Sequence, residues 1–136
     1  MAEFFPWNQD LYSVGVKTLD EQHKKLVALI NTLFDAMKIG KGSTVVGKTL
    51  DELIEYTKVH FHDEEEHMAK CNYPELSSHK KLHGKLIQDV LKIKEKFSTG
   101  PHINISIETL DFLKDWLTNH IQGVDKKYAP YMQKNE

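Results

Sequence analysis

Apolar residues recur along most of the chain at alternating intervals of three and four, the spacing of one face of an α-helix. Short breaks that contain glycine or proline separate four such stretches. The pattern predicts helices over roughly 19–38, 44–70, 75–97 and 106–128. Faces of this kind pack at shallow angles, and short connections make neighbours antiparallel. We therefore expect an all-α fold, an up-down-up-down antiparallel four-helix bundle.

The ends of the first predicted helix carry their own signals. Thr18 followed by Glu21 matches a capping box, in which the two side chains satisfy the first backbone N–H groups. Gly40 and Gly42 follow the last apolar position and fit the end of a helix. The residues before this helix, around Trp7, are expected to form an N-terminal arm that packs along the bundle.

The predicted apolar faces also contain polar residues. These share the registers of their hydrophobic neighbours: His23 on the first helix, His60 and Glu64 on the second, His79 and His83 on the third, and His120 on the fourth. A lone histidine on such a face is usually a core residue with a hydrogen-bond partner. Burying all six groups unpaired would cost about 1–3 kcal/mol each, so one shared partner explains them better. A metal site is such a partner.

The positions along each helix agree with a common site. His23 lies near the start of the first helix, and His60 lies near the end of the second. His79 and His83 lie near the start of the third, and His120 lies near the end of the fourth. Because successive helices of the predicted bundle reverse direction, all of these positions fall at the same end.

The number and type of candidate ligands point to two ions. Five imidazoles around one ion would be unusual, whereas two ions bridged by a carboxylate would share them. Imidazole with carboxylate favours iron, with manganese, copper or zinc as alternatives, over calcium and magnesium. His79 and His83, four residues apart, can chelate one ion from a single helix face.

The segment HFHDEEEH, residues 60–67, contains more candidate ligands than the site needs. His62 lies about 200° around the helix from His60 and should face water. We expect three acids to be solvated as well: Asp63, Glu65 and Glu66. Glu64 and His67 form the ExxH pair of ferritin-like diiron sites, but the chain has no second copy, so His67 is expected at the surface or edge. His102 lies in a predicted loop and is not expected to be a ligand.

Composition and charge limit the domain number, the partners and the cellular compartment that we expect. The 136 residues are most simply one domain, 1–136, with 40% hydrophobic and 28% charged residues. A net charge of −2 without a basic stripe gives no reason to expect nucleic acid as a partner. Apolar runs are too short for membrane insertion, and the opening MAEFFPWNQD does not resemble a signal peptide. The single cysteine, Cys71, fits a reducing compartment, so we expect a cytoplasmic protein.

Four segments together resemble the hemerythrin family in its single-domain bacterial form: VGVKTLDEQHKKL, HFHDEE, NYPELSSHKKLH and HIQGVD. The resemblance implies a non-haem centre of two iron ions that binds dioxygen reversibly. It also implies the ligands of each ion: His79, His83 and His120 for one iron, His23 and His60 for the other, and Glu64 and Asp125 as bridges beside an oxo or hydroxo group. Dioxygen would bind at the vacant position of the two-histidine iron.

Asp125 is the one implied ligand that the periodicity does not find. It follows His120 by five residues, which places it about 140° away on a regular helix. If Asp125 is a bridge, the helix must be distorted between the two residues. Gly123 lies in that interval, and we predict a bulge or another helix irregularity there.

The vacant position should open into an apolar pocket. Helix spacing places five apolar residues near the ligands: Leu117, Trp116, Phe61, Leu26 and Ile121. Ordinary core packing is the alternative role for each of them, and one side chain can serve both.

The resemblance favours a dioxygen-binding protein, not an enzyme, for storage, transport or delivery to an oxygen-consuming enzyme partner, and we expect a monomer. A diiron enzyme with peroxidase, oxidase or nitric oxide reductase activity is an alternative. An oxygen sensor would be expected to need an attached output domain. A zinc-stabilised structural bundle is disfavoured by a carboxylate-bridged ligand set for two ions.

Overall fold

The computed structural model describes residues 4–38, 43–98 and 107–133. Within these residues the chain is all-helical, which confirms the predicted class, and no strand occurs there. The elements are α1 (Gln9–Tyr12), α2 (Lys17–Lys38), α3 (Ser43–Lys70), α4 (Leu76–Ser98), α5 (Ile107–Gly123), the 3₁₀-helix η1 (Asp125–Lys127) and α6 (Ala129–Gln133). No helix in the described part of the chain is both long and apolar enough to cross a membrane.

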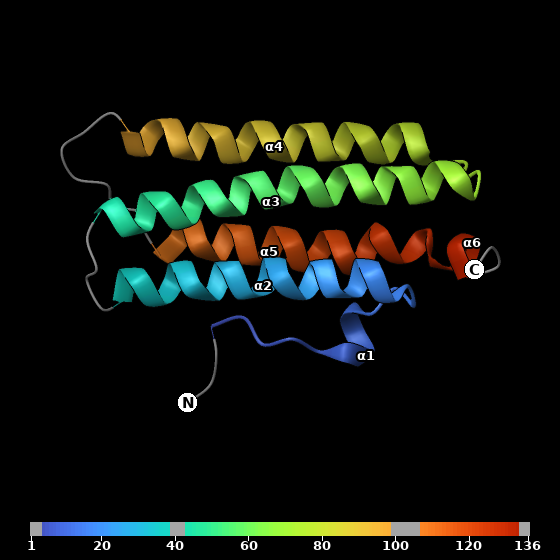
Figure 1. The fold of residues 1–136 in the computed structure, drawn as a ribbon, viewed down its shortest axis with the longest axis horizontal. Helices are drawn as coiled ribbons and strands as arrows, with labels where there is room; N and C mark the ends of the chain where they lie inside the picture. The colour runs from blue at the N-terminus through green and yellow to red at the C-terminus, as the bar shows by residue number, and fades with distance from the viewer. Residues whose placement is uncertain (1–3, 39–42, 99–106, 134–136) are drawn as a thin grey trace.

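The four long helices lie side by side along the longest axis of the molecule (Figure 1). Helix α2 packs against α3 and α5, and α3 also packs against α4. In Figure 1 each long helix starts at the end of the molecule where the previous one stops. The described residues form six α-helices rather than the predicted four, because α1 and α6 add short helices of four and five residues. Helices of this length are too short to show a period of three and four.

The predicted apolar positions form the core between the long helices. Leu33 of α2, Leu50 of α3 and Leu110 of α5 are almost completely buried in one cluster, with Leu86 and Val90 of α4. Burying a side chain of this size contributes roughly 1.5–3 kcal/mol, so this cluster is the main source of helix stability. The helices hold together through the faces that the spacing predicted.

A second, smaller core closes one end of the molecule, where α6 lies in Figure 1. Its buried members come from the segment before α2, from α2 itself, from the end of α3 and the turn after it, and from the chain beyond η1: Val14, Val16, Leu19, Met68, Cys71, Tyr73, Tyr128 and Met132. The Cys71 thiol is free and buried here. Asn72 turns the chain toward α4 with a φ of 55°, in a region that asparagine tolerates better than most residues.

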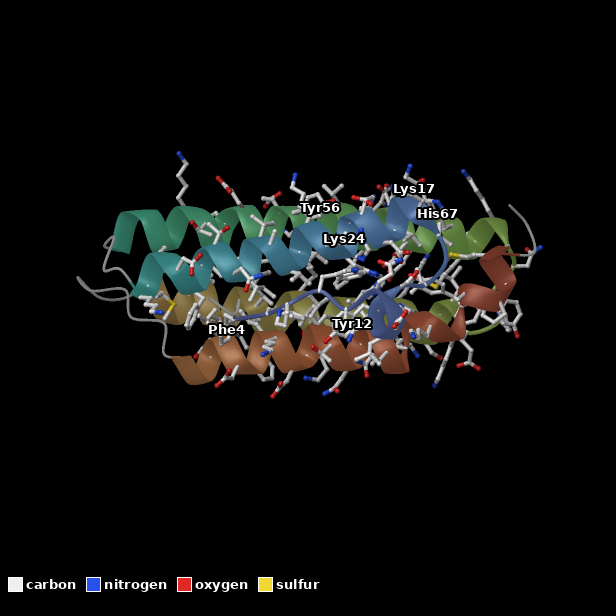
Figure 2. All side chains as sticks on the ribbon, turned by 90° about the horizontal axis from the view of Figure 1, so that it is seen from below. Phe4, Tyr12, Lys17, Lys24, Tyr56 and His67 are labelled. Carbon is white, nitrogen blue, oxygen red and sulfur yellow. The ribbon has the colours of Figure 1, made fainter. Side chains whose placement is uncertain are left out.

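The N-terminal arm packs along the bundle, as expected. Figure 2 shows it running from Phe4 to Tyr12 across the face formed by α2 and α5. The backbone N–H of Phe5 donates to Asn31 Oδ1 at 2.7 Å, and Asn31 Nδ2 donates back to the Phe5 carbonyl at 2.9 Å. Lys114 donates to the carbonyl of Phe4 at 2.8 Å, so both α2 and α5 hold the arm.

The start of α2 differs from the predicted capping box. The helix begins at Lys17, so Thr18 lies inside its first turn instead of preceding it. Asp20 is the acceptor in this region, because its carboxylate accepts from the Ser13 hydroxyl at 2.6 Å and from the Val14 N–H at 2.8 Å. A carboxylate in the first turn also interacts favourably with the positive end of the helix dipole. Asp20 therefore fixes the direction in which the arm enters α2.

Candidate metal centre

All seven residues implied as ligands lie at one end of the bundle, and all are buried. They come from five elements: His23 from the start of α2, His60 and Glu64 from the second half of α3, His79 and His83 from the start of α4, His120 from the end of α5 and Asp125 from η1. The end in question is the one where α3 leads into α4 and α5 leads into α6 (Figure 1). Residues up to 102 positions apart in the sequence, His23 and Asp125, thus meet at one place.

The seven side chains form two overlapping groups, each able to hold a metal ion. The larger group contains Glu64, His79, His83, His120 and Asp125. The smaller group contains His23, His60, Glu64 and Asp125. Within each group one possible ligand atom per residue lies within 4.8 Å of all the others. The two carboxylates belong to both groups, which is the arrangement expected when carboxylates bridge two ions.

Each of the five buried histidines directs its Nε2 atom at the carboxylate of Glu64 or Asp125. On the side of α2 and α3, Nε2 of His23 and Nε2 of His60 each lie 3.2 Å from Glu64 Oε2. On the side of α4 and α5, Nε2 of His83 lies 3.0 Å from Glu64 Oε1 and 3.2 Å from Nε2 of His120. Two nitrogen lone pairs that face one another at this distance repel unless a proton or a cation lies between them. The Nε2 atoms therefore point at positions where a cation would be stabilised.

The unpaired polar atoms of the cluster fit a metal. Both carboxylate oxygens of Asp125, Oε1 of Glu64 and Nε2 of His79 are fully buried without a hydrogen-bond partner. The atoms are close, since His79 Nε2 lies 3.0 Å from Asp125 Oδ1, but their angles do not make a hydrogen bond. Buried polar groups left in this way cost about 1–3 kcal/mol each. Oxygen and nitrogen atoms that converge on shared points are what a transition-metal ion needs.

Aromatic side chains form the wall of the site on the α4 and α5 side. The ring of Phe61 stacks on His83 with centroids 3.7 Å apart and planes 1° from parallel. Trp116 stacks on His120 at 4.6 Å and 12°. Stacking restricts the rotation of both imidazoles and excludes water from them. Stacking therefore holds these two candidate ligands in place without a bound ion.

Buried histidines and carboxylates in the cluster shift one another's pKa. Burial opposes the charged form of His23, but the adjacent carboxylates of Asp125 and Glu64 outweigh it and raise the pKa of His23 to about 10. The pKa of His79 rises to about 9 for the same reasons. Burial acts against the ionised form of Glu64 as well, yet the surrounding histidines hold the pKa of Glu64 well below its usual range. Without metal, protons therefore balance the two carboxylates, and metal ions would replace these protons.

The irregularity predicted near Gly123 is confirmed. Helix α5 ends at Gly123, and Val124 has a φ of −115° and a ψ of −53° before the chain continues as η1. This change turns the side chain of Asp125, the first residue of η1, into the bundle, where it is 1% exposed. Asp125 thus reaches Nε2 of His120 at 3.0 Å, although the two residues would lie on different faces of a regular helix.

A small apolar cavity of about 30 Å³ lies in the core beside the cluster. It is lined by residues of all four long helices: Leu26, Ile30, Leu53, Thr57, Phe61, Leu86, Val90, Leu113, Trp116 and Leu117. Four of the five predicted pocket residues are among them, whereas Ile121 is buried elsewhere in the core. Helix spacing could not exclude Ile121, because the direction of its side chain depends on how α5 packs.

Tyr128 is a site residue that sequence reasoning missed. Its ring is completely buried, and its hydroxyl donates to Glu64 Oε2 at 2.8 Å. Burial and the charge of Glu64 raise the pKa of Tyr128 well above its usual value, so the phenol remains a donor. Tyr128 lies beyond η1, where the period of α5 is lost. No pattern in the sequence marked it.

Two of the acids expected to face water instead contact the ligands or their partners. Glu65 Oε2 lies 2.8 Å from Nδ1 of His83, and Asp63 accepts a hydrogen bond from Gln22 at 2.8 Å. The expectation that these acids are solvated was wrong, because the edges of a helix face are covered by neighbouring helices. Glu66 is exposed at the surface, as expected.

The remaining histidines lie apart from the cluster. His62 faces water with its side chain 72% exposed, as predicted. His67 is half-buried at the edge of α3, where its Nδ1 lies 2.8 Å from the carbonyl of Asp63. His102 lies outside the described residues.

The fold and the site together define an all-helical protein with a buried histidine and carboxylate cluster able to hold metal ions. Residues 14–132 match the family model described as the hemerythrin HHE cation binding domain. The chain belongs to the hemerythrin family.

Several known proteins are similar over most of the chain. A bacteriohemerythrin from Methylococcus capsulatus (strain Bath) is 37% identical over 124 residues, covering 91% of this chain and 93% of that protein. A hemerythrin-like protein from Naegleria gruberi is 39% identical, with 91% and 90% covered. A crystal structure of wild-type hemerythrin superimposes with a TM-score of 0.88 at 35% identity, covering 95% of this chain and 98% of that one.

Proposed function

We propose that this protein binds dioxygen reversibly at a pair of iron ions held in the buried cluster. The observation that carries the proposal is the convergence of five Nε2 atoms on two shared carboxylates, Glu64 and Asp125. Membership of the hemerythrin family supports it. The family's two irons, when bound, supply the electrons and the open coordination position that dioxygen needs.

The two overlapping groups support a proposed assignment of each ligand. The larger group, with His79, His83 and His120, would hold one iron, and the smaller group, with His23 and His60, would hold the other. Glu64 and Asp125 would bridge the ions, beside an oxo or hydroxo group. The unequal number of histidines would leave the vacant position on the ion at the side of α2 and α3, which only His23 and His60 would hold.

The surrounding residues restrict what can reach the site. Leu26, Phe61, Trp116 and Leu117 line the adjacent cavity, which is too small for anything larger than a small molecule and offers it an apolar surface. Tyr128, which belongs to the second, smaller core, donates a hydrogen bond to Glu64 and keeps that carboxylate oriented. An apolar pocket offers water few hydrogen-bond partners and so favours dioxygen over water.

Repeated oxygenation tests the proposal. The iron-loaded protein is reduced without oxygen, exposed to oxygen, and returned to an oxygen-free atmosphere while its visible absorption is followed. We expect an absorption band that appears with oxygen and disappears on its removal over several cycles. Rapid conversion to a permanently oxidised form would contradict reversible binding and favour the alternative of a diiron enzyme or an oxygen sensor.

Metal content tests the ligand assignment separately. The protein should bind two irons per chain, and His79→Ala should lower that number. His62→Ala is the matched control, because His62 lies on α3 but faces water, and it should retain both irons. Zinc in place of iron in the purified protein, or two irons in the His79→Ala variant, would contradict the proposed centre.

Further parts of the proposal concern the whole protein. We propose that α2, α3, α4 and α5 form an up-down-up-down antiparallel bundle in one domain, and that the protein acts as a monomer in storage or transport of dioxygen or in its delivery to an oxygen-consuming partner. The cytoplasmic location and the absence of enzyme activity stay predictions from the sequence. Native mass determination in solution tests the monomer.

A further inference from the structure

The Nδ1 atoms of the candidate ligands differ in what they contact. Nδ1 of His60 lies 2.7 Å from Gln22 Oε1, and Nδ1 of His83 lies 2.8 Å from Glu65 Oε2. The Nδ1 atoms of His23 and His79, in contrast, are buried without a hydrogen-bond partner. Each of the two overlapping metal groups therefore contains one histidine whose far nitrogen has a defined partner, His60 in one and His83 in the other.

The contact at His83 allows only one arrangement of protons. An ionised carboxylate such as that of Glu65 can accept hydrogen bonds but cannot donate them. The proton must therefore be on Nδ1 of His83, which donates to Glu65. In the neutral ring, Nε2 then carries a lone pair, and this lone pair points into the cluster toward Glu64 and His120. This is the tautomer that a metal ion requires.

The contact between His60 and the amide of Gln22 also places the proton on Nδ1. The side chain of Gln22 could present either its oxygen or its NH₂ group to His60. Gln22 Nε2, however, donates to Asp63 Oδ2 at 2.8 Å, and the Asp63 carboxylate can only accept. The NH₂ group is therefore committed to Asp63, Gln22 Oε1 faces His60, and Nδ1 of His60 must carry the proton.

We propose that Glu65 and the Gln22–Asp63 pair are positioning residues that hold His83 and His60 in the metal-binding tautomer before an ion arrives. The inference rests on the proposed function of the cluster as a metal centre, and it adds residues that the resemblance to the family did not supply. One preset histidine in each group gives each ion a first ligand in the correct form. Such partners typically change metal affinity by about 10–100-fold.

The proposed role of Glu65 is tested by Co²⁺ titration of the metal-free protein. Glu65→Ala should weaken Co²⁺ binding by about tenfold or more. Glu66→Ala is the matched control, since Glu66 is the next residue of α3, carries the same charge and is exposed. Glu65→Gln should recover only part of the affinity, because an amide accepts from Nδ1 of His83 in one orientation but donates to it in the other. A purely electrostatic role would instead give Glu65→Gln the same loss as Glu65→Ala.

The proposed role of the Gln22–Asp63 pair is tested by ¹⁵N NMR of the histidine rings in metal-free protein. The spectra are recorded at a pH at which they show neutral rings for His60 and His83. In the wild type, His60 and His83 should carry their protons on Nδ1. Asp63→Asn can donate as well as accept, so Gln22 is free to turn over, and the His60 signals should shift toward a mixture of tautomers. The His83 signals should stay unchanged in this variant.

The outcomes separate this inference from the proposed function. Equal Co²⁺ affinity in Glu65→Ala and Glu66→Ala, or His60 protonated on Nε2 in the wild type, would overturn the positioning role while leaving oxygen binding intact. A wild-type protein that takes up two irons but does not bind oxygen reversibly would overturn the proposed function, and the NMR result would stand. Circular dichroism checks that each variant is folded.

Discussion

Glu64 is a buried carboxylate that contacts histidines from three helices. Its side chain is completely buried, and its two oxygens lie within 3.3 Å of four histidines: His23, His60, His79 and His83. Burying a lone carboxylate would be prohibitive, so Glu64 is stable only because positive charge surrounds it. In the metal-free protein that charge comes from protons, and in the loaded protein it would come from metal ions.

Replacing Tyr128 with phenylalanine should destabilise the protein without changing its fold. The ring would still fill the same space, but Glu64 Oε2 would lose a buried donor at 2.8 Å. We expect the free energy of unfolding to fall by about 1–3 kcal/mol in urea denaturation of the metal-free protein. A loss below about 0.5 kcal/mol would contradict the role of the buried hydrogen bond.

The metal-free protein should lose stability in alkaline solution. The pKa of His23 rises to about 10 and that of His79 to about 9, both above the ordinary value of 6.5. A raised pKa contributes stability that is fully present below pH 6.5 and is lost as the pH rises through 9 to 10. We expect Tm to fall by at least about 4 °C between pH 6.5 and pH 10.5.

His23→Gln serves as the control for this pH dependence, because glutamine does not titrate. The fall in Tm across the same range should be smaller in the variant than in the wild type. An identical fall would mean that His23 does not contribute to it. A Tm that stays flat in the wild type would show that protons on the cluster do not stabilise the fold.

At the scale of elements, the decisive feature is the end of α5. A regular helix from His120 onward would place Asp125 on another face, whereas the change to η1 after Val124 turns it into the cluster. The helix stops there without a demand for glycine, since a Cβ at Gly123 would meet nothing within 4 Å. The register between α5 and η1, rather than the residue type at 123, therefore sets the position of Asp125.

Inserting one alanine between Gly123 and Val124 tests the importance of this register. The insertion rotates Asp125 by about a further 100° around the helix axis, away from His120, and so removes one of the two shared carboxylates from the cluster. We expect Co²⁺ affinity to fall by at least about tenfold. Gly123→Ala is the matched control, and it should leave affinity unchanged and Tm equal or slightly higher. Similar losses in both variants would contradict the assigned role of the register.

At the scale of the whole molecule, binding and stability are distributed over different regions. The histidine and carboxylate cluster lies between the ends of the long helices, beside the core that contains Tyr128 and Met132. The arm is held to the other core by Asn31 and Lys114, and Phe5 is completely buried there. The arm therefore belongs to the folded unit, although it contributes no ligand to the cluster.

Replacing Phe5 with alanine should lower the stability of the fold without changing metal binding. Loss of a fully buried aromatic ring should lower the free energy of unfolding by about 3–5 kcal/mol. Co²⁺ affinity at low temperature, where the variant is still folded, should stay within twofold or so of the wild type. Leu11→Ala changes an exposed residue of the same arm and should cost less than about 0.5 kcal/mol. A large loss of Co²⁺ affinity in Phe5→Ala would show that the arm and the cluster are coupled.

Much of the fold and of the cluster could be predicted because both depend on helix periodicity. His23, His60, Glu64, His79, His83 and His120 occupy the same registers as leucines that form the core, and all six are buried. Thr18 and Glu65 do not follow the prediction from periodicity. The start of α2 is set by Asp20 and the arm, and Glu65 is covered by α4, so neither outcome depends on periodicity within one helix.

The spacing of apolar residues determined the helices, their buried faces and the end of the molecule at which the histidines gather, because a period of three and four fixes which side chains share a face. Tertiary structure alone decided the contacts between elements. Tyr128 reaches Glu64, Gln22 is oriented by Asp63, and Ile121 turns away from the cavity only because helices pack in one particular register. Such contacts depend on rotations and offsets between helices, which no pattern within a single helix contains.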